Sequence, residues 1–325
     1  MICFLRVCSQ NVLCFSGLAL FGCVPTESEA VEEASMCTAQ PSALDGSGSI
    51  VLVRGDLEGA GLTLCSGVLV SPRLALTHQS CLVLPSEVDA ADLVVDDERP
   101  SFDGRELHSG DVDYASTCRV DAGWDPLESG DFAAWLGQPL DPATVTVSVV
   151  RDGAELASTT VQQILLPHAA SRCWDILAAM VLEDELPAVL RPVRVMEVTA
   201  PGDAVTIGAF SVSLTEPQFR DAVVEAVTLD TAAAGTPPRS LELSRQVCFS
   251  EPGGAVVSDS GAIIGLIGYG TGAFCGDPEG RTIATRLAPF RRMLLDAARE
   301  AGDRLPVEAA QISGVGGAIP ACVEP

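Results

Sequence analysis

The types of basic side chain in this 325-residue chain limit the chemistry it can perform. There are three histidines and no lysine, so all 19 basic residues are arginines. Arginine stays protonated in proteins and cannot accept a proton. A serine–lysine pair is therefore impossible, and a serine–histidine pair would need one of the three imidazoles. The three histidines are His78, His108 and His168.

A glycine-containing loop after Cys248 has the form of a nucleophile loop. Residues 248–255 read CFSEPGGA, which resembles the stretch CxGDSGGP of the trypsin-like serine proteases. The resemblance aligns Ser250 with the first glycine, Glu251 with the aspartate and Pro252 with the nucleophilic serine. Proline has neither a hydroxyl nor a backbone N–H. The alignment thus implies that the nucleophile and one of the two oxyanion donors are absent.

A second stretch resembles the family segment that carries the catalytic histidine. Residues 65–81 read CSGVLVSPRLALTHQSC, which is similar to CxGxLIxxxxVLTAAHC in its apolar positions and in the spacing of its cysteines. Ser80 stands at the histidine position. His78 lies two residues earlier, and positions i and i+2 of a helical turn are about 200° apart. We therefore expect His78 to be a surface or capping residue and not a replacement base.

The resemblance also suggests positions for the acid and the specificity pocket. Residues 174–182 read WDILAAMVL, similar to the family motif NDIALLxL, which makes Asp175 the equivalent of the triad acid. Asp131 is the rival, because its neighbours match locally although its flanking strands fit worse. Gln246 aligns with the floor of the specificity pocket, where trypsins carry aspartate.

The resemblance covers residues 49–81 and 144–300. It implies an all-β fold of two antiparallel Greek-key barrels of six strands each, with a C-terminal helix. The expected divisions are a signal peptide (1–22), an acidic flexible tether (23–48), a first barrel (49–196) with an acidic insertion at about 82–143, a second barrel with the final helix (197–300), and a tail (301–325).

Twelve cysteines are many for a chain of this length. An even number in an exported domain indicates a disulfide framework. The resemblance implies the pairs Cys65–Cys81 and Cys248–Cys275. For four others we propose Cys118–Cys173 and Cys37–Cys322. No pair has C-x-x-C spacing and no acidic run matches a calcium loop, so we expect no metal and no cofactor.

The N-terminus predicts export. A positive charge at Arg6 precedes an apolar run that is too short for a confident membrane span. Residues 20–23 read LFGC, which resembles a bacterial lipobox, so Cys23 is the predicted lipidation site. The alternative is an ordinary signal peptide and a secreted protein. A lipid anchor would hold the domain to the cell envelope without spanning the membrane.

The charge of the chain restricts its partners. A net charge of −25 and a pI of about 4.2 argue against nucleic acid and against direct contact with anionic membranes. We therefore expect a protease homologue without the catalytic Ser and His that binds an unknown protein or peptide. One alternative is a divergent hydrolase that uses His78 or His168 with a displaced serine such as Ser250. Another is a structural component of the envelope.

Overall fold

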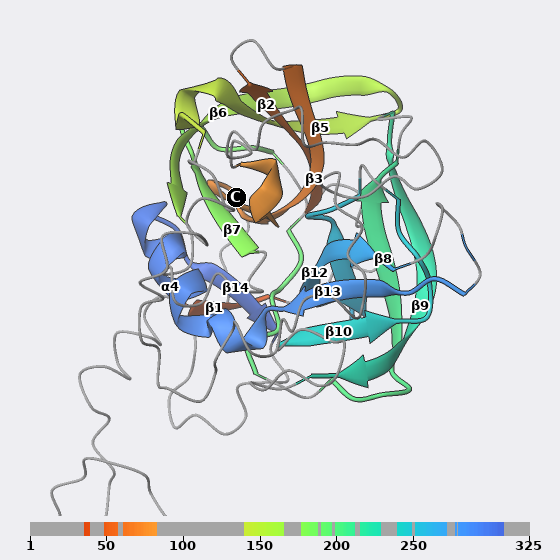
Figure 1. Ribbon diagram of the computed structural model, residues 1–325. Helices are drawn as coiled ribbons and strands as arrows, with labels where there is room; N and C mark the ends of the chain where they lie inside the picture. Colours follow the sequence, from red (N-terminus) through yellow and green to blue (C-terminus); the bar gives the residue numbers. More distant parts are fainter. Residues whose placement is uncertain are drawn as a thin grey trace, which may run out of the picture.

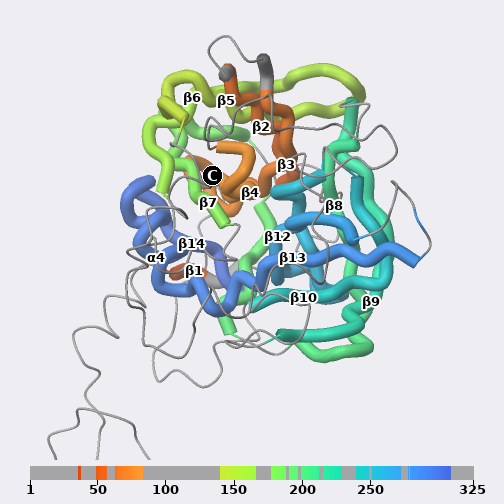
Figure 2. The backbone as a smooth tube through the Cα atoms, viewed as in Figure 1, coloured from red at the N-terminus to blue at the C-terminus, as the bar shows by residue number. Residues whose placement is uncertain are grey.

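The computed structural model forms two closed barrels of six antiparallel strands each, which confirms the expected fold class (Figures 1 and 2). The first barrel has the strand order β2-β3-β4-β7-β6-β5 and the second the order β10-β13-β12-β11-β8-β9. The structure describes residues 36–39, 49–57, 61–82, 140–165, 177–187, 190–196, 199–211, 215–228, 239–248, 251–271, 277 and 279–308. The strands are β1 (Met36–Ala39), β2 (Ile50–Leu57), β3 (Gly61–Ser71), β4 (Leu74–His78), β5 (Val145–Arg151), β6 (Ala154–Leu165), β7 (Leu177–Leu182), β8 (Ala204–Phe210), β9 (Pro217–Val227), β10 (Ser240–Leu243), β11 (Ala255–Ser258), β12 (Ile263–Gly270), β13 (Thr282–Arg286) and β14 (Leu305–Glu308).

Strands β4 and β7 are buried along their whole length because both of their faces are covered. Successive side chains of a strand point to opposite faces. Accordingly, the cross-strand neighbours Ala75 and Met180 pack inside the first barrel, whereas Leu76 and Ala179 belong to a core shared with the second barrel and the helix. This explains why β7 reads as a continuous apolar run and why β4 begins with three consecutive apolar residues.

The C-terminal helix α4 (Arg291–Glu300) follows the 3₁₀ turn η5 (Ala288–Phe290) and packs against the first barrel (Figure 1). The helix ends at Glu300, and Gly302, two residues later, has a φ of +73° that suits glycine. The N–H groups of Gly302 and Asp303 bond back to the carbonyls of Arg299 and Ala298. The Asp303 carboxylate accepts hydrogen bonds from Ser71 Oγ at 2.7 Å and from Arg73 N at 2.9 Å. These bonds fix the end of the helix to the first barrel.

Strands β1 and β14 lie in the segments that the sequence analysis expects to be the tether and the tail. They pair in parallel, and the linker between the barrels joins them through a bridge at Val193 and an ion pair from Arg194 to Glu308 at 2.9 Å. Burial raises the pKa of Glu308, but hydrogen bonds from Arg194 and Ser260 outweigh this effect and hold its pKa below the usual value. Residues 36–39 and 305–308 are therefore part of the folded domain.

The predicted insertion lies mostly outside the described residues, but its two ends are visible. Leu140 N donates to Leu82 O at 2.8 Å, and both side chains are buried in the first barrel. The chain next forms the 3₁₀ turn η3 (Pro142–Thr144) and enters β5. Leu82 and Leu140, the described residues on either side of this segment, therefore lie next to each other in the first barrel. Within the described part of the chain, no helix is long and apolar enough to cross a membrane.

Candidate functional site

The loop before β11 lies wedged between the two barrels. Gly253 has a φ of +84°, and its N–H donates to Ile267 O at 2.8 Å. A Cβ at this position would overlap the carbonyl oxygen of Ser66 and Thr77 Oγ1, both on the first barrel. Thr77 Oγ1 in turn donates to Ser66 O at 2.7 Å. Glycine is required here because the second barrel's loop touches the first barrel's backbone.

Pro252, the residue aligned with the nucleophile, is buried in this loop. Its carbonyl accepts a hydrogen bond from Ser66 N at 3.1 Å. The next residue brings the loop to the end of β4, where a Cβ on Gly253 would lie 2.8 Å from His78 N. The loop that contains Pro252 therefore contacts the first barrel at Ser66 and approaches the end of β4 through Gly253.

The side chain of Glu251 also holds this loop in place. It is fully buried, and its carboxylate accepts hydrogen bonds from Arg220 on β9 and from the backbone N–H of Cys248. The backbone N–H of Glu251 donates to Cys248 O at 3.1 Å, which closes a short turn. A buried carboxylate needs such partners, because an isolated buried charge is very costly. No motif in the sequence indicates that Arg220 is the partner of this acid.

Ser80 is exposed and makes a close contact with His78. Its hydroxyl lies 2.6 Å from His78 Nδ1, and its backbone N–H donates to the same nitrogen at 3.1 Å. Because Nδ1 is the acceptor, the neutral imidazole carries its proton on Nε2. His78 is thus the N-cap of the 3₁₀ turn η2 (Gln79–Cys81), as one of the two expected roles stated.

The surface position offered as the other role for His78 is wrong, because the side chain is only 6% exposed. The helical-spacing argument also does not apply. His78 has extended dihedrals (φ −75°, ψ 136°) and precedes the turn, so its side chain can meet a residue two positions later. Burial lowers the pKa of His78 from 6.5 to about 4. The imidazole is therefore neutral at pH 7 and is a poor base.

This pKa predicts a pH-dependent stability. Between pH 6.5 and pH 4 the unfolded chain binds a proton at His78 that the folded chain does not bind. The free energy of unfolding should therefore fall as the pH is lowered through this window, by up to about 3 kcal/mol. Thermal unfolding between pH 7 and pH 5 would measure this loss of stability. The pKa of Glu308, which is held below its usual value, lies under this pH range.

The variant His78→Asn keeps a capping side chain but does not titrate. It should lose most of the pH dependence over that range. The variant His108→Gln/His168→Gln is the matched control and should keep it. An unchanged pH profile in His78→Asn would contradict the assignment.

Gln246, at the predicted pocket floor, is also buried, with 6% of its surface exposed. Its side chain packs against Gly270 and Gly280. Gln246 Oε1 has no hydrogen-bond donor among the described residues.

The disulfide predictions are tested only in part. The Cys65–Cys81 bond is confirmed, with a Cα–Cα distance of 6.1 Å. Cys37 and Cys248 are also disulfide-bonded, but their predicted partners lie outside the described residues, so those two pairings stay predictions. The other predicted positions outside the described residues are Asp175, Asp131, Ser250, Cys23, Cys118, Cys173, Cys275, Cys322, His108 and His168.

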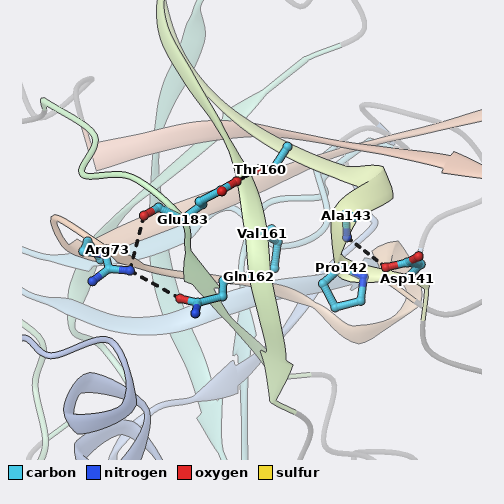
Figure 3. A pocket seen from close by; sticks show the side chains of 8 residues that line it. All are labelled: Arg73, Asp141, Pro142, Ala143, Thr160, Val161, Gln162 and Glu183. Carbon is cyan, nitrogen blue, oxygen red and sulfur yellow. Dashed lines mark hydrogen bonds between the residues drawn. The ribbon is translucent and has the colours of Figure 1, made fainter.

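An open cavity of about 410 Å³ lies on the first barrel, over β6 and the η3 turn (Figure 3). Its polar groups mainly bond to one another or to nearby backbone: Arg73 donates to Gln162 and to Glu183 O, and Asp141 accepts from Ala143 N. These contacts hold neighbouring segments together, so we assign no chemistry to the cavity. In the described residues, no group of three or more His, Cys, Asp or Glu side chains is arranged to hold a metal ion.

Comparison with known proteins identifies the fold. No protein-family profile and no curated protein matches the sequence. Human heparin binding protein superposes with a TM-score of 0.50 at 13% identity, over 84% of this chain and 100% of that chain. The chain has the trypsin-like serine protease fold. An inactivated protease paralogue of the scabies mite gives a TM-score of 0.50 at 11% identity, over 81% and 100% of the two chains.

Proposed function

We propose that this protein is an exported, lipid-anchored homologue of the trypsin-like serine proteases that has no peptidase activity and acts as a binding or scaffold module. The observation that carries the proposal is Pro252. The resemblance aligns it with the nucleophile; in the structure its side chain is buried and its carbonyl accepts a hydrogen bond from Ser66 N. Acyl transfer needs a nucleophile, a base and oxyanion donors. Proline has no hydroxyl to act as the nucleophile and no backbone N–H to act as an oxyanion donor.

The position that the resemblance aligns with the catalytic histidine also lacks a suitable group. Ser80 has a hydroxyl that cannot take up a proton near neutral pH. Loss of one oxyanion donor costs on the order of 3 kcal/mol of transition-state stabilisation, even when the nucleophile is intact. The fold itself is compatible with an inactive protein, since one structurally similar protein is named an inactivated protease paralogue.

The partner is most simply a protein or peptide. A net charge of −25 disfavours polyanions such as heparin, which the human protein of similar fold is named for. The same charge disfavours nucleic acid. Contact with a membrane would then come through a lipid on Cys23 alone.

A hydrolase with a displaced nucleophile is the second candidate, and one observation favours it. The Ser80 hydroxyl lies 2.6 Å from a neutral imidazole, that of His78. However, general-base catalysis works best when the pKa of the base is near the working pH, and burial lowers the pKa of His78 to about 4. The contact is better explained as the cap of the η2 turn.

Restoration of the missing groups tests the proposal. Pro252→Ser returns a hydroxyl and an N–H, and Ser80→His returns the base. Neither single variant should react with a serine-directed fluorophosphonate, because nucleophile and base act as a unit. The double variant, with Ser250→Gly added to match the family loop, is expected to gain labelling. Glu251 is kept in all variants because it holds the loop through Arg220. Labelling of the Ser80→His variant alone would show that another serine is the nucleophile.

Lipid anchoring is tested at Cys23. The mature protein should partition into the detergent phase, and Cys23→Ala should stay in the aqueous phase or accumulate unprocessed, since the lipid supplies the membrane affinity. Cys14→Ala, in the same N-terminal segment, is the matched control and should partition like the unmodified protein. Detergent partitioning that survives Cys23→Ala would disprove the anchor without affecting the proposal for the barrels.

A further inference from the structure

The C-terminal segment runs from the second barrel to the first and back again (Figure 1). It leaves the second barrel after β13 and forms α4, which packs beside β7 of the first barrel. At the end of the helix, the Asp303 carboxylate accepts hydrogen bonds from Ser71 and Arg73 of the first barrel. Strand β14 then returns to the linker between the barrels, where it bridges to Val193.

A largely buried ion pair and a serine hydroxyl fix the returning end to the second barrel. Arg194, in the linker, donates to both carboxylate oxygens of Glu308, at 2.9 Å and 3.2 Å. Ser260, in the turn between β11 and β12 of the second barrel, donates to the same carboxylate and accepts from Arg194 at 3.0 Å. The side chains of Arg194 and Glu308 are 11% and 7% exposed. Strand β14 is therefore tied through one carboxylate to a turn of the second barrel.

Backbone hydrogen bonds support the same connection. Val193 N donates to Pro306 O on β14 at 2.8 Å. Arg194 N donates to Ile263 O, at the start of β12, at 2.9 Å. The linker therefore lies between β14 and the second barrel and is bonded to both.

Other hydrogen bonds join the two barrels directly. Ser66 N on the first barrel donates to Pro252 O at 3.1 Å, and Phe210 N on the second barrel donates to Ser66 Oγ at 2.9 Å. Gly153 N, in the hairpin between β5 and β6, donates to Thr215 O at 2.8 Å. None of these groups belongs to the C-terminal segment or to the linker. Their exchange with solvent therefore reports on the barrels themselves.

We infer that residues 291–308 form a strap that holds the two barrels in one fixed arrangement, and that the Arg194–Glu308–Ser260 network fastens its end to the second barrel. Two folded units joined by a linker move relative to each other unless their interface is well fixed. When the network is broken, the strap stays on the first barrel through α4, and the barrels are free to shift. The inference goes beyond the proposed function, because it concerns the movement of the barrels and needs no binding partner.

Glu308→Gln tests the strap by hydrogen exchange, resolved to single amides in the folded full-length protein. The interbarrel amides of Ser66, Phe210 and Gly153 should exchange roughly 5- to 30-fold faster, because a hydrogen bond to a charged group is lost. The amides that pair β4 with β7 inside the first barrel should change by less than about twofold, since that barrel stays closed. Acceleration of both sets by the same factor would mean a general loss of stability and would overturn the inference.

Arg194→Met breaks the same ion pair from the linker side. It should accelerate the three interbarrel amides at least as strongly as Glu308→Gln, because the Glu308 carboxylate keeps its charge without a cation. If Arg194→Met does not fold, Ser260→Ala takes its place. That variant removes one hydrogen bond of the network, so it should give a smaller acceleration of the same amides. Unchanged interbarrel exchange in Glu308→Gln or in the second variant would overturn the inference.

Glu225→Gln is the matched control. It breaks the ion pair with Arg281 in the second barrel, in which the side chains of Glu225 and Arg281 are 36% and 30% exposed. Exposed pairs contribute little to stability, so the exchange of the interbarrel amides should stay within about twofold of the unmodified protein. Faster interbarrel exchange in this control would show that loss of any charge in the second barrel loosens the barrels, and the strap would be disproved.

Discussion

Replacement of Gly253 by alanine is expected to destabilise the protein severely or to prevent its folding. The new Cβ would overlap Ser66 O and Thr77 Oγ1, and alanine would have to adopt a φ of +84°. The backbone penalty is about 1–2 kcal/mol and overpacking adds typically 1–3 kcal/mol. The combined loss, roughly 3–5 kcal/mol, would be measured by denaturant or thermal unfolding.

Gly202→Ala separates the two penalties. Gly202 also has a positive φ, of +95°, but nothing lies within 4 Å of its Cβ position. Its replacement should cost only the backbone term, about 1–2 kcal/mol. If both variants lose the same amount of stability, the close approach of the loop to the first barrel adds no overpacking penalty, which would contradict the prediction for Gly253→Ala.

Replacement of Arg220 by methionine is the second change with a large expected effect. Methionine keeps much of the side-chain length but removes the charge partner of Glu251, whose side chain is 1% exposed. Breaking a buried ion pair on one side typically costs 3–5 kcal/mol, because the remaining charge is left uncompensated. The lower end, about 3 kcal/mol, is expected because Arg220 itself is 22% exposed.

Two further variants check the cause of this loss. Arg54→Met breaks the exposed pair with Glu155, in which both side chains are 39% exposed, and should cost less than about 1 kcal/mol. Adding Glu251→Gln to Arg220→Met removes the unpaired charge and should recover part of the stability. A larger loss in this double variant than in Arg220→Met would show that the charge of Glu251 is not the problem.

The architecture could be predicted from the sequence because its strong signals are local. The cysteine-bounded stretch at residues 65–81 and the glycine loop at 248–255 each contain their own pattern, and strands β4 and β7 lie within the quoted stretches 65–81 and 174–182. The Cys65–Cys81 bond followed from the same stretch.

What the sequence did not reveal depends on partners far away in the chain. Strand β1 pairs in parallel with β14, which joins the two ends of the fold. Each strand is short, and neither contains a repeated pattern that would predict this pairing. Arg220 is one of 19 arginines, so composition cannot select it as the partner of Glu251. The Ser80–His78 contact depends on the extended dihedrals of residue 78, which spacing alone does not specify.

The most direct test of the central claim is the reaction of the unmodified protein with a fluorophosphonate probe, which modifies activated serines. Intact mass spectrometry of the purified, folded protein would measure it, with trypsin as the reactive reference and the heat-denatured protein as the background. We predict no adduct above that background, because Pro252 has no hydroxyl and the imidazole that contacts Ser80 is weakly basic. A stoichiometric adduct, mapped by peptide sequencing to Ser80, Ser250 or any other serine, would contradict the account.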